Sequence, residues 1–180
     1  MSAFDNFNPD FNNQHAQLEK VKSFKNSVKN TLFLVGTVGV GKTHLAKEFS
    51  KLYNKKKIGD LMSVGYRDTC AFIPVRDFHF LLYEYMFPDM EYTGSLKIYF
   101  KDLFCMECVI IDDLGTEPIE NKGYFRSGLQ DFLDRFTGKL LITTNLNGEA
   151  LQEKYGEKIF SRLCENMEWV DMVGKDYRRR

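Results

Sequence analysis

The chain has 180 residues, of which 43% are hydrophobic and 28% charged, with 25 basic and 25 acidic side chains. This length suits one ordinary domain, and the composition is that of a globular protein, which argues against extensive disorder. The balanced charge neither favours nor excludes nucleic acid as a partner, so any DNA contact would need a local basic patch. No apolar stretch approaches the roughly 20 residues of a membrane span, and the polar N-terminus is unlike a signal peptide. We therefore expect a cytoplasmic protein with no membrane partner.

The cysteines lie in or beside apolar segments, which is typical of reduced core residues and predicts no disulfides. They are Cys70, Cys105, Cys108 and Cys164. Cys105 and Cys108 have the spacing of half a zinc site, but no second Cys or His pair lies at a suitable distance to complete it. We interpret the pair as structural and without metal.

Residues 1–30 form a polar N-terminal segment that contains the aromatic residues Phe4, Phe7 and Phe11. Apolar residues then recur at helical spacing with lysines between them, at Leu18, Val21, Phe24 and Val28. We expect residues 1–30 to be an extended arm followed by a helix, and residues 31–180 to form the main domain.

Short apolar runs without polar alternation predict parallel strands that are covered on both faces. These runs are residues 31–35, 70–75, 108–111 and 140–144, with a weaker candidate at 169–173. Helix-length segments lie between them, at 42–53, 76–87, 124–136 and 148–166, and residues 54–69 and 88–94 resemble loops. The alternation predicts an α/β fold with a mainly parallel five-stranded sheet and helices on both faces.

The pattern G-x-x-x-x-G-K-[ST] lies directly after the first predicted strand and directly before a helix, as its chemistry requires. Its glycines let the backbone present N–H groups to phosphate oxygens, and the helix points its positive dipole end at the same anion. We expect the loop to bind ATP, with Lys42 bridging the β- and γ-phosphates and Thr43 ligating Mg²⁺. The loop consists of Gly36, Thr37, Val38, Gly39, Val40, Gly41, Lys42 and Thr43.

The predicted strand at 108–111 ends in two adjacent carboxylates. Such a pair is costly beside a core unless a metal or a reaction uses it. We expect Asp112 to hold Mg²⁺ through water and Asp113 to polarise the attacking water as a general base or positioning group. The alternative is a turn with solvated carboxylates. Glu117 is a weaker candidate for the same cluster.

The strand predicted at 140–144 ends in Asn145. The carboxyl ends of parallel strands share one rim, so Asn145 should face the same cleft as Thr43 and Asp112. There it is a candidate for orienting the attacking water or touching the γ-phosphate. Taken alone, it is equally well interpreted as a helix N-cap or turn residue.

In this order, the segments GTVGVGKTHL, VIIDDLGTE, ITTNL, IFSRL and GKDYR resemble the DnaC/DnaI-type branch of the AAA+ ATPases. That branch includes replicative-helicase loaders and IstB-type transposase helpers. The resemblance extends from the segment Phe4–Pro9 to Arg178. It implies a P-loop NTPase fold with a three-layer αβα arrangement. It also implies that the helical lid is missing, since only a short segment follows Trp169.

The resemblance also implies roles for further residues. His44 extends the phosphate loop, and Asn145 takes the position called sensor 1. Arg162 matches the arginine finger that reaches a neighbour's γ-phosphate, which implies a homo-oligomer; its alternative is a surface ion pair. Arg178 matches an arginine that senses the γ-phosphate in cis. Phe7 lies in the segment that covers the nucleotide base in relatives, with a plain hydrophobic anchor as the alternative.

The function that the resemblance implies is an ATPase that loads or remodels a replicative hexameric helicase, binding ATP, Mg²⁺ and single-stranded DNA and assembling on them. The alternatives are an IstB-like transposase helper and a nucleotide-gated adaptor with little hydrolysis. Basic and aromatic residues would bind the DNA. Candidates without diagnostic spacing are Lys97, Tyr99, Phe100, Lys101, Lys122, Tyr124 and Arg126.

Overall fold

The computed structural model describes residues 3–53, 56–58, 65–67, 69–87, 100–117 and 122–178. Its centre is a five-stranded sheet in the order β4-β5-β6-β1-β7, in which every neighbouring pair is parallel. The strands are β1 (Thr31–Val35), β4 (Cys70–Pro74), β5 (Cys108–Leu114), β6 (Lys139–Thr144) and β7 (Met167–Asp171). The predicted parallel α/β sheet is therefore confirmed, and the weak candidate at 169–173 is a strand that begins two residues earlier.

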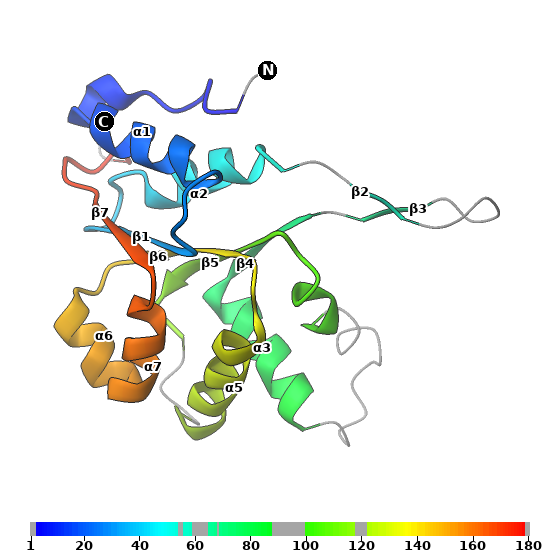
Figure 1. The fold of residues 1–180 in the computed structure, drawn as a ribbon. Coiled ribbons are helices and arrows are strands. Elements are labelled where there is room, and N and C mark those ends of the chain that lie inside the picture. The colour runs from blue at the N-terminus through cyan, green and yellow to red at the C-terminus, as the bar shows by residue number, and fades with distance from the viewer. Residues whose placement is uncertain are drawn as a thin grey trace.

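Helices cover both faces of this sheet, which gives the three αβα layers (Figure 1). The helices on one face are α1 (His15–Phe24) and α2 (Lys42–Ser50), and those on the other are α3 (Val75–Met86), α5 (Lys122–Arg135), α6 (Gly148–Tyr155) and α7 (Glu157–Cys164). Every residue of β1 is buried. Leu32 and Leu34 pack with the α1–α2 layer, whereas Phe33 and Val35 pack with the opposite layer. This two-sided burial is why the strand runs show no polar alternation.

Three predictions about elements need correction. The segment predicted as one helix at 148–166 is two helices, because the chain breaks at Gly156, which has a φ of 88°. Helix α1 ends at Phe24, so Val28 is 86% exposed and does not belong to its buried stripe. The predicted loop at 54–69 contains two short antiparallel strands, β2 (Lys56–Ile58) and β3 (Gly65–Arg67). The predicted loop at 88–94 lies outside the described residues.

The N-terminal arm is folded against the α1–α2 layer rather than extended throughout. Phe4 and Phe7 are buried in the same cluster as α1 and α2, and a 3₁₀ helix spans Pro9–Asn12. The arm and the C-terminal tail meet beside the phosphate loop, and Figure 1 shows the two chain ends on the same side of the sheet. In the part of the chain that the structure describes, no helix is both long and apolar enough to cross a membrane.

Candidate nucleotide-binding site

A pocket of about 680 Å³ lies where the carboxyl ends of β5 and β6 meet the phosphate loop. The predicted residues that line it are Phe7, Val38, Gly39, Gly41, Lys42, Thr43, His44, Asp113, Asn145 and Arg178. Lining residues that the sequence reasoning missed are Asn6, Asn8, Lys47 and Tyr177. Four predicted residues are not part of the lining but contact residues near it: Asp112, Gly36, Thr37 and Val40.

Lys42, at the first position of α2, is buried below the phosphate loop. Its Nζ donates to the carbonyl oxygens of Gly36 and Thr37, both at 2.8 Å, and to Asn145 Oδ1 at 2.7 Å. Burial lowers the pKa of Lys42, and the nearby carboxylates of Asp113 and Asp112 oppose that shift. The three donors of one ammonium thus tie the loop to the end of β6. Asn145 lies in the predicted cleft, and its side chain is a partner of Lys42.

Gly39 shows why this loop needs glycine. Its φ is 81°, in the left-handed region that L side chains rarely adopt, and an added Cβ would overlap the Asp176 carboxylate. The Gly39 carbonyl also accepts the backbone N–H of Tyr177 at 2.9 Å. The loop is therefore packed directly against the C-terminal tail.

Thr43 and Asp112 form the candidate metal site. Thr43 Oγ1 donates to both carboxylate oxygens of Asp112, at 3.0 and 3.1 Å, and Thr143 Oγ1 donates to one of them at 2.7 Å. A hydroxyl and a carboxylate are hard oxygen donors of the kind that Mg²⁺ prefers, and Mg²⁺ is commonly held by one or two carboxylates plus phosphates and water. Within the described ranges there is no cluster of three or more His, Cys, Asp or Glu residues placed to hold a metal. The residues present therefore fit Mg²⁺ together with a nucleotide.

Asp113 lines the pocket from a left-handed backbone position with a φ of 59°. Its N–H donates to Thr143 Oγ1 at 2.8 Å, so a single threonine holds both members of the Asp112–Asp113 pair. Burial raises the pKa of Asp113 and the Asp112 charge raises it further, while Lys42 and Arg178 pull it down. A half-buried carboxylate with a raised pKa is suited to accepting a proton.

The arm contributes Phe7 to the pocket. This ring is 6% exposed, lies in the core cluster with α2, and meets the His44 ring edge-on at a centroid distance of 5.7 Å. Both interpretations of Phe7, as a core anchor and as a wall of the pocket, are thus compatible with its position.

Asn147, not Asn145, is the N-cap of α6, and its Oδ1 accepts the N–H of Ala150 at 2.9 Å.

The arm (Asn6–Gln14) and the tail (Val173–Arg178) join in what we call the clasp. Gln14 is fully buried, and its Nε2 donates to the carbonyls of Val40 at 3.1 Å and Val173 at 3.2 Å. Asn12 exchanges two hydrogen bonds with the backbone of Lys175, at 3.1 and 2.9 Å. The clasp therefore encloses the phosphate loop from both chain ends.

Tyr177 is one of the clasp residues that the sequence reasoning overlooked. Its hydroxyl donates to the Asn8 carbonyl at 2.8 Å, and its ring lies 4.1 Å from that of Phe11. It immediately precedes Arg178, which lines the pocket as predicted. Its place in the GKDYR segment was the sequence feature that could have identified it as a site residue.

Arg162 lies outside the pocket lining, on α7, with its side chain 43% exposed. Its guanidinium pairs with Asp134 at 2.7 Å and Glu165 at 2.6 Å. Within one chain it is therefore a surface ion pair, the alternative already given for this residue.

Glu117 does not join the Asp112–Asp113 cluster. It is buried, absent from the pocket lining, and bonded to Tyr155 and Lys154 of α6. The prediction was wrong because a carboxylate close in sequence is carried to the other side of the β5 turn.

Among the described residues, the candidate DNA residues do not form one surface. Phe100 is a core residue with no exposure, whereas Lys101 is exposed. Arg126 donates to the Lys154 carbonyl, and Tyr124 contacts His79. Lys97, Tyr99 and the side chain of Lys122 lie outside the described part of the chain.

The cysteines are free thiols. Cys108 is buried, and its strand neighbour Cys70 is half-buried. Cys105, the other half of the C-x-x-C pair, is exposed. Burial raises the pKa of Cys108, as expected of an unreactive core thiol.

No family model matches this sequence, and no curated protein matches it. Solved structures do match. The DnaC helicase loader has a TM-score of 0.71 with 21% identity, over 96% of this chain and 97% of that chain. DnaI has a TM-score of 0.60 with 14% identity, over 97% of this chain and 89% of that chain. The replication initiator DnaA bound to AMPPCP and single-stranded DNA has a TM-score of 0.66 with 16% identity, over 95% of this chain and 52% of that chain.

These matches and the site geometry define the class: the fold is that of a P-loop NTPase domain of the AAA+ type. Within that class the chain has the DnaC/DnaI-like AAA+ fold, as the order of its motifs predicted.

Proposed function

We propose that this protein is a cytoplasmic, ATP-dependent loader or remodeller of a replicative DNA helicase that acts on single-stranded DNA. The observation that carries the proposal is the meeting of Lys42, Asp113 and Asn145 around one pocket in a DnaC/DnaI-like fold. The residues come from the phosphate loop and from the ends of two different strands. That arrangement has the positioning parts that phosphoryl transfer to water requires.

In the proposed reaction, Lys42 exchanges its bonds to the loop carbonyls for bonds to the β- and γ-phosphates. Thr43 and Asp112 would hold Mg²⁺, whose charge offsets that of the phosphates. Asp113 accepts the proton of the attacking water, and Asn145 orients that water or the γ-phosphate. Phe7 and Tyr177 would pack beside the base, because flat rings stack on a purine face.

A co-purification experiment tests the client. The protein is mixed with the host's hexameric replicative helicase and, in parallel, with any co-encoded transposase, each with ATP or ADP. We expect ATP-dependent retention of the helicase and faster transfer of that helicase onto single-stranded DNA. Retention of the transposase alone would instead favour an IstB-like helper. Helicase retention without ATP turnover would favour an adaptor. Lys42→Ala is the control, because it should lose the ATP dependence of each interaction.

The proposed assembly is tested through Arg162. If ATP and DNA build an oligomer in which Arg162 leaves its surface ion pairs to reach a neighbour's γ-phosphate, Arg162→Ala should lower turnover by about 10³-fold or more. Mixing it with Asp113→Ala should restore activity, because each variant supplies what the other lacks. A mixture that is no more active than its separate components would contradict the role of Arg162 at a neighbour's nucleotide. Gel filtration with ATP, Mg²⁺ and single-stranded DNA should show a species larger than the monomer.

A further inference from the structure

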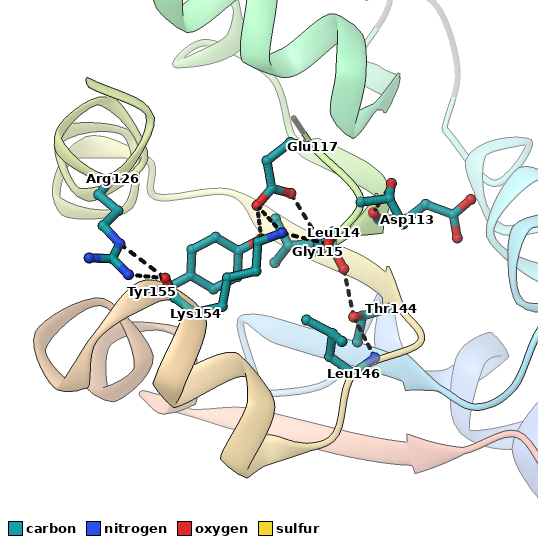
Figure 2. A network of polar contacts seen from close by, with 10 residues as sticks. Asp113, Leu114, Gly115, Glu117, Arg126, Thr144, Leu146, Lys154 and Tyr155 are labelled. Carbon is teal, nitrogen blue, oxygen red and sulfur yellow. Dashed lines mark hydrogen bonds and ion pairs between the residues drawn. The ribbon is translucent and has the colours of Figure 1, made fainter. Parts of the chain in front are cut away.

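The turn after β5 is held by a second polar network beside the pocket (Figure 2). Its centre is Glu117, a carboxylate that is only 5% exposed. One oxygen accepts the Gly115 N–H at 2.9 Å, and the other accepts the Tyr155 hydroxyl at 2.8 Å and pairs with Lys154 at 2.9 Å. Lys154 Nζ also donates to the Gly115 carbonyl at 2.6 Å. The two charged side chains thus hold both polar backbone atoms of Gly115.

This turn is conformationally demanding. Gly115 has a φ of 106°, and an added Cβ would meet the Leu146 side chain at 2.5 Å. Asp113, two residues earlier, is a non-glycine residue at a φ of 59°. The register of β5 against β6 shifts between Ile111 and Leu114, and at this irregularity the Asp113 N–H donates to the Thr143 side chain of β6 at 2.8 Å. Such conformations persist where the surroundings over-determine them.

The hydrogen bonds of the turn show what fixes it. The Asp113 carbonyl accepts the Thr116 N–H at 3.1 Å and the Thr116 hydroxyl at 2.8 Å. The Leu114 carbonyl accepts the Thr144 hydroxyl at 2.6 Å. These anchors come from neutral groups on the turn itself or on the adjacent strand. The bonds to Gly115 differ, because charged side chains make them and Lys154 brings in a separate helix.

That helix also begins at the pocket. Two residues after Asn145, Asn147 caps α6, and Lys154 lies in the helix's last turn. The Lys154 carbonyl accepts Arg126 Nε from α5 at 3.0 Å, which anchors this end. Helix α6 therefore follows the pocket residue Asn145, and its Lys154 side chain contacts the turn that follows Asp113. Figure 2 shows the Asp113 side chain pointing away from Glu117.

We infer that Glu117 and Lys154 are a positioning pair that holds Asp113 in its place for hydrolysis, an inference that rests on the proposed ATPase function. A buried ion pair contributes little net stability, because desolvation offsets the attraction, and an apolar pair of similar volume often does as well. An apolar pair cannot, however, bond to both the N–H and the carbonyl of Gly115. Displacing a positioned group by even about 1 Å can lower a rate by about 100-fold. A small change in the orientation of this turn should therefore lower the rate of hydrolysis.

The test separates turnover from binding in the 180-residue chain. Glu117→Gln keeps the side-chain shape and one acceptor but removes the charge that holds Lys154. We expect its kcat for ATP hydrolysis to fall by about tenfold while KM and the Kd for ATP stay within about twofold. Lys154→Met should show the same pattern, and Lys154→Arg, which retains the charge, should recover most of kcat.

Phe132→Leu is the control, because it removes volume from the core at a buried position of α5 outside the turn. All variants are assayed at a temperature where circular dichroism shows them folded. Normal kcat in Glu117→Gln and Lys154→Met, with thermal stability lowered as in Phe132→Leu, would overturn the inference while leaving the proposed function intact. Absence of hydrolysis by the wild-type protein would overturn both.

Discussion

The pocket is built from two regions whose structures are encoded differently. The rim, which consists of Lys42, Thr43, Asp112, Asp113 and Asn145, comes from the phosphate loop and the ends of strands in the parallel sheet. The clasp joins the two ends of the chain, with hydrogen bonds between residues as much as 169 positions apart. In the proposed function the rim carries the groups that act in phosphoryl transfer, whereas the clasp carries mainly packing and backbone contacts and adds Arg178 to the pocket lining. If this division is correct, rim substitutions change binding or turnover strongly, and clasp substitutions change affinity and stability modestly.

Among the rim and clasp substitutions, Lys42→Ala should have the largest effect on ATP binding. It removes an ammonium that can make two or three charge-assisted hydrogen bonds to phosphate, so the affinity for ATP should fall by at least about 100-fold. Isothermal titration calorimetry measures this directly. Lys47→Ala is the matched control, because Lys47 also lines the pocket but its ammonium lies 5.4 Å from the Phe72 ring centroid. Unchanged ATP affinity in Lys42→Ala would contradict the assignment of the whole rim.

Asp113→Asn should leave binding nearly intact and remove turnover. Loss of a general base typically lowers a rate by about 10²–10⁴-fold, so we expect kcat to drop by about 100-fold or more. Release of phosphate in steady state provides the measurement. Asp131→Asn serves as control, since Asp131 forms an exposed ion pair with Arg135 on α5. Substantial turnover by Asp113→Asn would show that another group activates the water.

The rim could be predicted because its chemistry fixes its spacing. Lys42 and Thr43 follow the glycines directly, and Asp112 and Asn145 directly follow apolar strand runs whose ends a parallel sheet must bring together. Lys42 and Asn145 indeed meet at 2.7 Å, and Thr43 and Asp112 at 3.0 Å.

The clasp could not be predicted in this way. No spacing rule joins Gln14 to Val173, or Asn8 to Tyr177, because these contacts depend on where the completed sheet places the chain ends. The prediction that Glu117 joins the Asp112–Asp113 cluster failed for a related reason. The left-handed Asp113 and the turn at Gly115 redirect the chain after β5, and a carboxylate four residues from Asp113 then faces α6.

Phe7→Leu tests the clasp's aromatic wall. Leucine keeps an apolar anchor in the core but loses the flat face and part of the ring's volume, so the loss of stability should stay below the roughly 3–5 kcal/mol of a Phe→Ala truncation. If the ring contacts the base, ATP affinity should fall by about tenfold. Phe4→Leu is the control, because Phe4 is buried in the same cluster but does not line the pocket. Equal ATP affinities in the two variants would identify Phe7 as an anchor alone.

Gln14→Leu should have the smallest effect on ATP binding, a change of about threefold or less, together with a loss of stability. Removing the amide leaves the Val40 and Val173 carbonyls without their donor, but it also removes Gln14 Oε1, which is buried without a hydrogen-bond partner. These terms oppose each other, so the loss should lie near 1 kcal/mol, at the low end of the range of about 1–3 for a buried unpaired group. Urea unfolding with and without ATP measures both quantities.

Gln17→Leu is a close match for that experiment. Gln17 lies on α1, three residues after Gln14, which precedes this helix. It donates one bond to a tail-side carbonyl, that of Asp171 at 3.1 Å, and its Oε1 is likewise buried without a hydrogen-bond partner. It does not line the pocket or contact the phosphate loop, so its loss of stability should be the same with and without ATP. In Gln14→Leu, by contrast, the stabilisation that ATP adds should shrink, since the stabilisation by a bound ligand grows with the logarithm of its affinity for the folded state. Identical ATP responses in the two variants would mean that the clasp holds the chain ends together without influencing the phosphate loop.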